Sequence, residues 1–147
     1  LLEYGGDARR GREIVTNHAA AQCIRCHKIG KEGGKKSAEI TIGPELTRIG
    51  KIRDRKHLVA SLLTPSSAIS DGFGTVILKT IEGEEVSGIL TRKTDLFWTI
   101  TLADGKKRNL RPDEISSHIL ASTMPPMGAI LKPEEVRDVV EFLAHQK

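Results

Sequence analysis

The sequence lacks any long apolar run. No stretch of its 147 residues is long and apolar enough to cross a bilayer, so we expect no membrane span. The first residues, LLEYGGDARRG, contain no apolar segment before a small-residue cleavage site, and no signal peptide is visible. The length is that of one domain. We therefore expect a mature protein or a domain cut from a larger polypeptide.

Aromatic residues are also scarce. The chain has three phenylalanines, one tryptophan and one tyrosine, whereas a domain of this size usually needs large rings to fill its core. A bound macrocycle could supply that bulk instead.

The formal net charge is +4, and positive residues cluster at 53–56 (RDRK) and 106–108 (KKR). Such clusters either favour acidic partners, a protein surface or a nucleic acid, or are simply solvated.

Cysteine is limited to one short motif. Cys23 and Cys26 lie in the stretch CIRCH and are followed at once by His27. A thioredoxin-type pair sits at the start of a helix in a βαβ unit, but here a helical pattern precedes the motif. A structural zinc site needs four ligands, and the chain has no further cysteine to supply them. The remaining interpretation of C-x-x-C-H is covalent haem attachment, with the histidine as iron ligand.

The stretch before this motif has the apolar spacing of a helix. In GGDARRGREIVTNH, Asp7 is a good N-cap, and Gly11, Ile14, Val15 and His18 recur on one face. A glycine within this stripe costs about 1 kcal/mol relative to alanine. The cost makes sense where another helix crosses closely.

Two further helices are expected. DRKHLVASLL follows Asp54, a potential N-cap, and ends before Pro65. In KPEEVRDVVEFLAHQK, Pro133 suits the first helical position. The apolar stripe of this closing helix consists of Val136, Val139, Val140 and Leu143. Residues 28–43, rich in glycine, lysine and serine, are expected to form a loop.

The part between these helices is rich in short β-type runs. They are FGTVILKT, EEVSGILT, LFWTITL and KKRNLR. In the third run, Leu96, Trp98, Ile100 and Leu102 alternate with Phe97, Thr99 and Thr101, as in a half-buried strand. These runs predict a small antiparallel meander.

Four motifs, taken in order, resemble those of the class I c-type cytochromes. They are the helix GDARRGREIV, the CIRCH motif, GPELTRIG at 43–50 and MPPMGAILKPEEVRDVVEFL at 124–143. The resemblance implies a helical fold in which the first helix crosses the last at Gly11. It also implies one covalently bound haem c per chain.

The same resemblance implies roles for individual residues. The carbonyl of Pro44 would accept a hydrogen bond from His27, and Leu46 would pack on the haem. Met124, which directly precedes a proline, would be the distal iron ligand, with Met127 as the competing thioether. His27 and Met124 would then be the two metal ligands.

Two other residues are candidates for the haem propionates. Arg48 follows the Pro44 loop, and a guanidinium matches the geometry of a carboxylate. Trp98 could donate its indole N–H, although its place on an apolar stripe favours core packing.

The β-rich block departs from the pattern of small class I cytochromes. Together with NHAAAQCIRCHKIG, the strand start DGFGTV and the ending MPPMG, it resembles the CxxCH haem-binding domain of planctomycete and verrucomicrobial (PVC-type) proteins. That domain is often the C-terminal module of large secreted proteins. We therefore expect an α+β fold. The cytochrome c haem domain would comprise 1–72 and 121–147, and a β-rich subdomain, an SH3- or Sm-like barrel or sheet, would be inserted at 73–120.

With both axial ligands supplied by the protein, the implied function is electron transfer and not enzyme catalysis. The implied partners are a dehydrogenase donor, fused or separate, and a respiratory acceptor, and the implied location is periplasmic or otherwise extracytoplasmic. The alternative is a sensor or catalytic haem with a labile distal ligand that binds a small gas or peroxide; His118 is a competing sixth ligand. Nucleic-acid binding is not expected, because Phe97 and Trp98 alternate to opposite faces and form no stacking platform.

Overall fold

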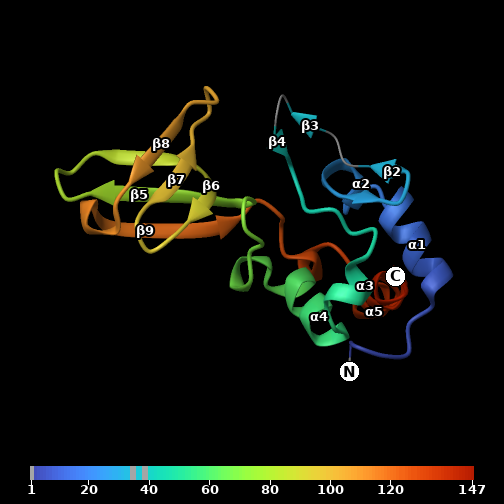
Figure 1. Cartoon of the computed structure of the whole chain (residues 1–147). Helices are drawn as coiled ribbons and strands as arrows, with labels where there is room; N and C mark the ends of the chain where they lie inside the picture. Colours follow the sequence, from blue (N-terminus) through green and yellow to red (C-terminus); the bar gives the residue numbers. More distant parts are fainter. Residues whose placement is uncertain (1, 34–35, 38–39) are drawn as a thin grey trace. The chain divides into compact units, whose positions relative to one another are not determined.

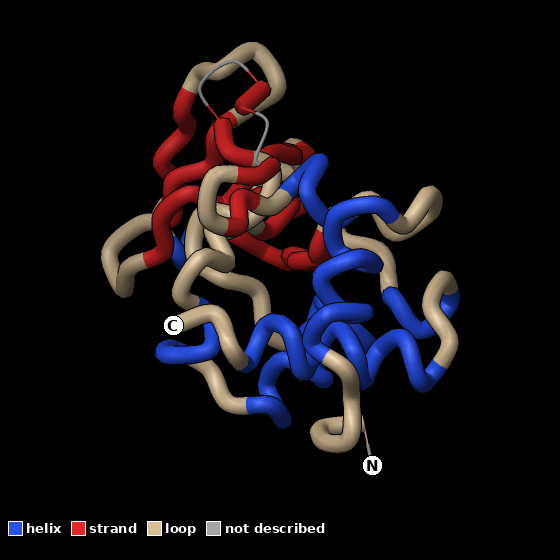
Figure 2. The backbone as a smooth tube through the Cα atoms, turned by 90° about the vertical axis from the view of Figure 1, so that its right-hand side faces the viewer, coloured by secondary structure: helices blue, strands red, loops and turns tan. Residues whose placement is uncertain are grey.

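The chain divides into two compact units (Figure 1). The computed structural model describes residues 2–33, 36–37 and 40–147. Leu1–Ala68 and Met124–Lys147 make up what we call the helical unit, and Ile69–Thr123 make up the β unit. Figure 2 shows that helices dominate the first and strands the second. The chain therefore has the expected α+β composition.

The helical unit is built from short and medium helices. They are α1 (Ala8–Asn17), α2 (Cys23–Cys26), α3 (Ile49–Ile52), α4 (Arg55–Leu63) and α5 (Pro133–Ala144), with 3-10 turns η1 (Pro65–Ser67) and η3 (Met127–Ala129). Both expected N-caps are confirmed. The side chain of Asp7 accepts hydrogen bonds from the N–H groups of Arg9 and Arg10, and that of Asp54 accepts one from His57. Each cap stabilises its helix by about 1 kcal/mol.

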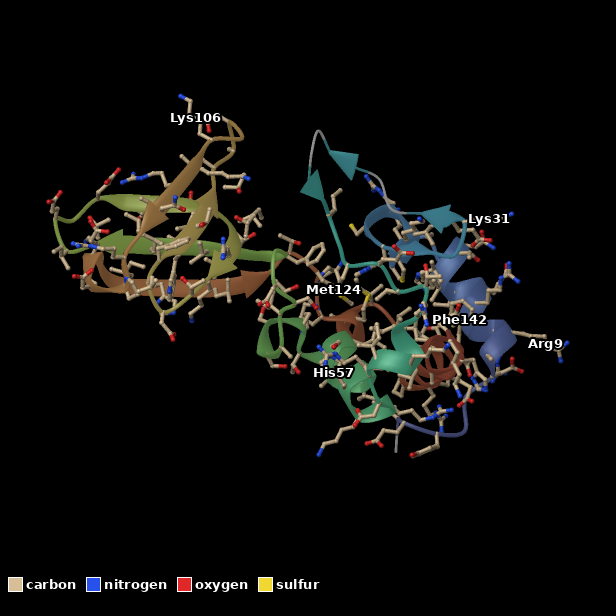
Figure 3. The ribbon with its side chains drawn as sticks, viewed as in Figure 1. Arg9, Lys31, His57, Lys106, Met124 and Phe142 are labelled. Atoms are coloured by element: carbon tan, nitrogen blue, oxygen red, sulfur yellow. The ribbon has the colours of Figure 1, made fainter. Side chains whose placement is uncertain are left out.

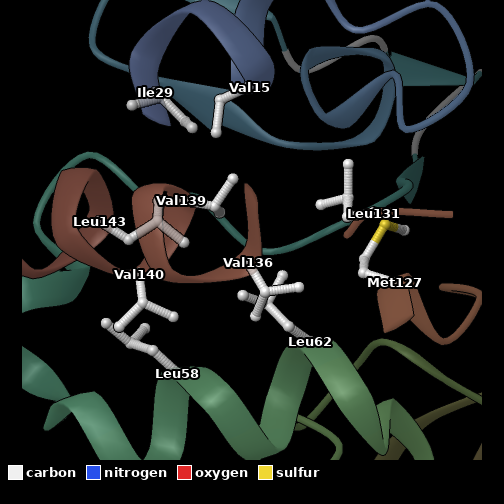
Figure 4. Close-up of a cluster of buried hydrophobic side chains, with 10 residues drawn as sticks. All are labelled: Val15, Ile29, Leu58, Leu62, Met127, Leu131, Val136, Val139, Val140 and Leu143. Atoms are coloured by element: carbon white, nitrogen blue, oxygen red, sulfur yellow. The ribbon is translucent and has the colours of Figure 1, made fainter. Parts of the chain in front are cut away.

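Helix α5 lies at the centre of the core of the helical unit. Its expected apolar stripe is confirmed, since all four side chains are at most 5% exposed. Figure 4 shows that Val15 and Ile29 pack on one side of α5, and that Leu58 and Leu62 of α4 pack on the other. Each buried aliphatic side chain contributes roughly 1.5–3 kcal/mol, so this helix organises the unit.

Helix α1 crosses α5 at Gly11, as expected. A Cβ atom on Gly11 would lie 1.9 Å from the carbonyl oxygen of Asp138. The side chain of Asp138 is itself buried, and it accepts hydrogen bonds from the N–H of Asp7 at 2.7 Å and from Arg10, whose Nε lies 2.9 Å away. A buried carboxylate is tolerated when it is paired in this way. Asp138 therefore fixes the beginning of α1 on α5.

A second ion pair joins α4 to α5 and gives the unit a testable pH dependence. Arg55 donates to both carboxylate oxygens of Glu141, at 2.6 and 2.9 Å, and lowers the pKa of that carboxyl; His145 also lies 3.4 Å from it. Because the folded-state pKa is lowered, the stabilisation is present above the ordinary value of 4.5 and is lost as the pH falls through the lowered value. Glu141→Gln should lower the free energy of unfolding by about 1–2 kcal/mol at pH 7.

Urea denaturation of both proteins at pH 7 and pH 3 measures this difference. At pH 3 the two curves should approach each other, whereas a constant gap would show that the ion pair is not the cause. Glu82→Gln, at an exposed turn of the β unit, removes the same charge and serves as the control.

The β unit is an antiparallel sheet. Its strands are β5 (Gly74–Thr80), β6 (Glu85–Lys93), β7 (Trp98–Thr101), β8 (Lys107–Leu110) and β9 (Ile115–Ser122), with the 3-10 turn η2 (Pro112–Glu114) before the last. The strand order is β8-β7-β6-β5-β9. The first four strands form the expected meander, but β9 pairs with β5, whereas a simple meander would place it beside β8. The buried core of this unit consists of Val76, Leu78, Val86, Leu90, Trp98, Ile100 and Leu110.

The loop expected at 28–43 is only partly irregular. Two-residue ladders join β1 (Lys28–Ile29) to β2 (Glu32–Gly33), and β3 (Lys36–Ser37) to β4 (Ile40–Thr41). Residues 34–35 and 38–39 of that expected loop lie outside the described residues.

In the part of the chain that the structure describes, no helix has the length and apolarity needed to cross a membrane.

Candidate functional site

Both cysteines belong to a single helical turn. Cys23 and Cys26 are the first and last residues of α2, and the turn begins after Gln22, whose backbone is in the left-handed region (φ 45°). The N–H of His27 donates to the carbonyl of Cys23 at 2.9 Å and so closes the turn. Residues three apart on a helix share a face. Two half-buried free thiols and an imidazole are therefore held together by local backbone structure.

The environment of Cys23 does not favour a reactive thiolate. Burial raises the pKa of this thiol above its ordinary value. Redox-active C-x-x-C pairs have the opposite property, a lowered thiol pKa that supports thiolate attack.

The ring of His27 is fixed by one hydrogen bond. Its Nδ1 lies 2.8 Å from the carbonyl oxygen of Pro44, and since a carbonyl only accepts, Nδ1 carries the proton. Burial lowers the pKa of His27, and the hydrogen bond to Pro44 opposes that shift. The imidazole is therefore neutral near pH 7, with the lone pair on Nε2. This tautomer is the one in which Nε2 is able to bind a metal.

Two glycines bring the backbone close to His27. A Cβ atom on Gly43 would lie 2.8 Å from Cε1 and 2.9 Å from Nδ1 of the His27 ring. A Cβ atom on Gly33, whose φ is +77°, would lie 2.3 Å from the carbonyl oxygen of His27. Neither role was predicted from the sequence. The one available signal was the glycine directly before Pro44 in the GPELTRIG motif.

The two methionines have different environments. Met127 is 3% exposed and belongs to the buried core of the helical unit, beside Leu131 (Figure 4). Met124 is half-buried and packs against this core from its margin, as do Cys23 and Leu46. The structure therefore brings Cys23, Leu46, Met124 and Met127, predicted from separate motifs, to one hydrophobic cluster.

Arg48, the candidate for propionate pairing, is exposed at the surface of the helical unit. It stands at the N-cap of α3, where its carbonyl accepts from the N–H of Lys51. His18 follows α1 as its C-cap residue, and its Nδ1 accepts hydrogen bonds from the N–H groups of Ala20 and Ala21. These bonds hold the turn that joins α1 to α2.

Trp98 and His118 both lie in the β unit. Their rings meet edge to face with centroids 4.8 Å apart, and the Nζ of Lys93 lies 4.4 Å from the Trp98 ring centroid. Trp98 is 7% exposed, so it packs in the core of that unit. His118 is exposed and contacts this tryptophan.

The described residues contain no group of three or more histidine, cysteine or acidic side chains able to hold a metal ion. Among the described residues, Cys23 and Cys26 therefore have no third and fourth ligand of these types, and a structural zinc site needs four ligands. Compared with protein-family models and with curated proteins, the chain matches none.

Proposed function

We propose that the helical unit binds one haem c covalently through Cys23 and Cys26, and that the protein carries single electrons. His27 and Met124 would be the iron ligands. The observation that carries this proposal is the hydrogen bond from His27 Nδ1 to Pro44, which leaves Nε2 as the ligand atom immediately after a C-x-x-C turn.

The residues present fit such a group. Two thiols at the ends of one helical turn and an imidazole directly after it match the donor set of haem c attachment. The absence of a side chain on Gly43 lets the backbone approach the His27 ring, since a Cβ atom there would lie 2.8 Å from Cε1. When bound, the haem supplies a one-electron couple, and a methionine ligand raises its reduction potential. The protein's part is to fix the His27 ring, to supply a thioether sulfur and to surround both with an apolar cluster.

A class I cytochrome c fold for the helical unit is part of this proposal. The crossing of α1 and α5 at Gly11 and the return of the Pro44 loop to His27 support it. For the β unit we propose an SH3- or Sm-like arrangement, supported by the strand order and by the 3-10 turn before β9.

The proposed partners are a dehydrogenase that donates electrons and a respiratory acceptor, in an extracytoplasmic compartment. Exposed cations of the helical unit support an acidic partner surface; Figure 3 shows Arg9 and Lys31 extending away from its backbone. Such charges steer association and make its rate depend on ionic strength. The chain would act as the electron-carrying domain of a larger oxidoreductase system and not as an enzyme by itself.

The decisive experiment is expression in a host that attaches haem c outside the cytoplasm. The denatured protein should carry the added mass of one haem, and Cys23→Ser/Cys26→Ser should carry none. The reduced holoprotein should then fail to bind carbon monoxide, because both axial positions are filled. Absence of covalent haem would overturn the proposal, and ready carbon monoxide binding would favour the sensor or catalytic haem instead.

A further inference from the structure

Strand β9 forms one edge of the sheet in the β unit. It pairs with β5 along one side, and no strand in the described part of the chain pairs with its other side. All residues from 116 to 121 are exposed. An unpaired strand edge presents N–H and C=O groups to solvent and is a template for another strand.

Beyond the first residues of β9, this edge has little of the usual protection against pairing. Natural edge strands are shielded by lysines, prolines, bulges or short length. The sequence of β9, ISSHILAS, contains no proline and no acidic or basic residue other than His118. A register shift interrupts the ladder with β5 near the start of β9, and the strand pairs regularly from Ser117 to Ser122. At the opposite edge, β8 is only four residues long and begins with Lys107 and Arg108. The two edges of the same sheet therefore differ, and only β9 is open to pairing.

An apolar row ends at the β9 edge. Ile119 on β9 is 69% exposed, and its cross-strand partner on β5, Ile77, is 47% exposed. Opposed residues in adjacent strands lie on the same face of a sheet. This pair thus forms the start of a row that a further strand would continue.

We propose that β9 pairs antiparallel with β9 of a second copy of the chain, with Ile119 opposite Ile119 of that copy at the two-fold axis. In this register Ser117 faces Ala121 of the second copy, so the neighbouring positions on the same face are small and uncharged. The row would run Ile77, Ile119, Ile119, Ile77 across the dimer. At a two-fold axis Ile119 faces its own copy and the other positions face one another in pairs. None of these pairs opposes two like charges, because His118 faces Leu120.

Sedimentation or light-scattering measurements of mass against concentration test this dimer. The wild-type chain should form a dimer, and Ile119→Lys should raise the dissociation constant at least about tenfold, because two like charges would meet at the axis. Leu96→Lys is the matched control, since Leu96 is 76% exposed in the turn before β7 and lies outside the strand. It should leave the dimer unchanged.

Hydrogen exchange gives an independent readout. The β9 amides should exchange more slowly as the wild-type concentration rises, and at a constant rate in Ile119→Lys. A monomer at all concentrations would overturn the proposal. So would a dimer that Ile119→Lys does not weaken, or a larger assembly in which β9 pairs with β8 of another copy. None of these readouts depends on haem, so a failure here is distinguishable from a failure of the proposed function.

Discussion

Gly11→Ala is expected to lower the free energy of unfolding by about 3 kcal/mol or more, although alanine is the better helix former by about 1 kcal/mol. The added Cβ would lie 1.9 Å from the carbonyl oxygen and 2.5 Å from the carbonyl carbon of Asp138, and 2.8 Å from Cβ of Phe142. All three atoms are fixed by the backbone of α5, so no side-chain rotation relieves the contact. Helix α1 would have to move away from α5, and this would also disturb the hydrogen bond between Asp7 and Asp138.

Chemical denaturation followed by far-UV and near-UV circular dichroism measures this effect. Gly128→Ala is the matched control. Its added Cβ would meet only Cδ2 of Leu63, the end of a flexible side chain, at 3.0 Å. We expect a change within about 1 kcal/mol for the control. A Gly11→Ala protein as stable as the wild type would show that the two helices do not cross at this residue.

The helical unit was largely predictable because its signals are local. Asp7 and Asp54 lie directly before apolar stripes, and a cap acts within one turn of its helix. Gly11 is costly within a helix, and that cost by itself points to a close crossing of another helix. Asp138 was missed for the opposite reason. An aspartate within a helix usually faces solvent, and only the packing of α1 on α5 buries it.

In the β unit, local sequence patterns predict some of the strand pairings but not all of them. Alternation and turn residues predict the meander of the first four strands, since each pairs with its neighbour in sequence. The pairing of β9 with β5 joins Ile119 to Ile77, which are far apart in sequence, and no local pattern encodes such a partner. Leu96 was expected to alternate into the core, but the strand begins only at Trp98 and leaves it in the turn.

At the candidate site, the arrangement of the residues that are adjacent in sequence was predictable, but the burial of each side chain was not. Cys23, Cys26 and His27 are close in sequence, so their arrangement follows from one helical turn. The hydrogen bond from His27 to Pro44 was implied by resemblance and is present, although the identity of the bound group stays a proposal. The burial of the two methionines depends on how η3 packs in the core, and no local pattern specifies that packing.

Replacement of each methionine by alanine should separate the two roles. Met127→Ala removes a side chain that is 3% exposed, so it should lower the free energy of unfolding by about 2–5 kcal/mol through loss of burial and a residual cavity. Met124→Ala removes a half-buried side chain at the margin of the core and should cost less stability. If Met124 is the axial ligand, its removal should change the reduced holoprotein from one that excludes carbon monoxide to one that binds it stoichiometrically.

The two variants are each other's control. Carbon monoxide binding by Met127→Ala alone would reassign the ligand to Met127, and binding by neither would exclude a methionine from the axial position. The expected stability loss follows from the burial of Met127, and the expected carbon monoxide binding follows from the proposed ligation by Met124. A fully buried side chain contributes most through packing, and one at the margin of a core contributes less. Burial thus predicts the stability losses, whereas carbon monoxide binding by the two variants decides which sulfur is the ligand.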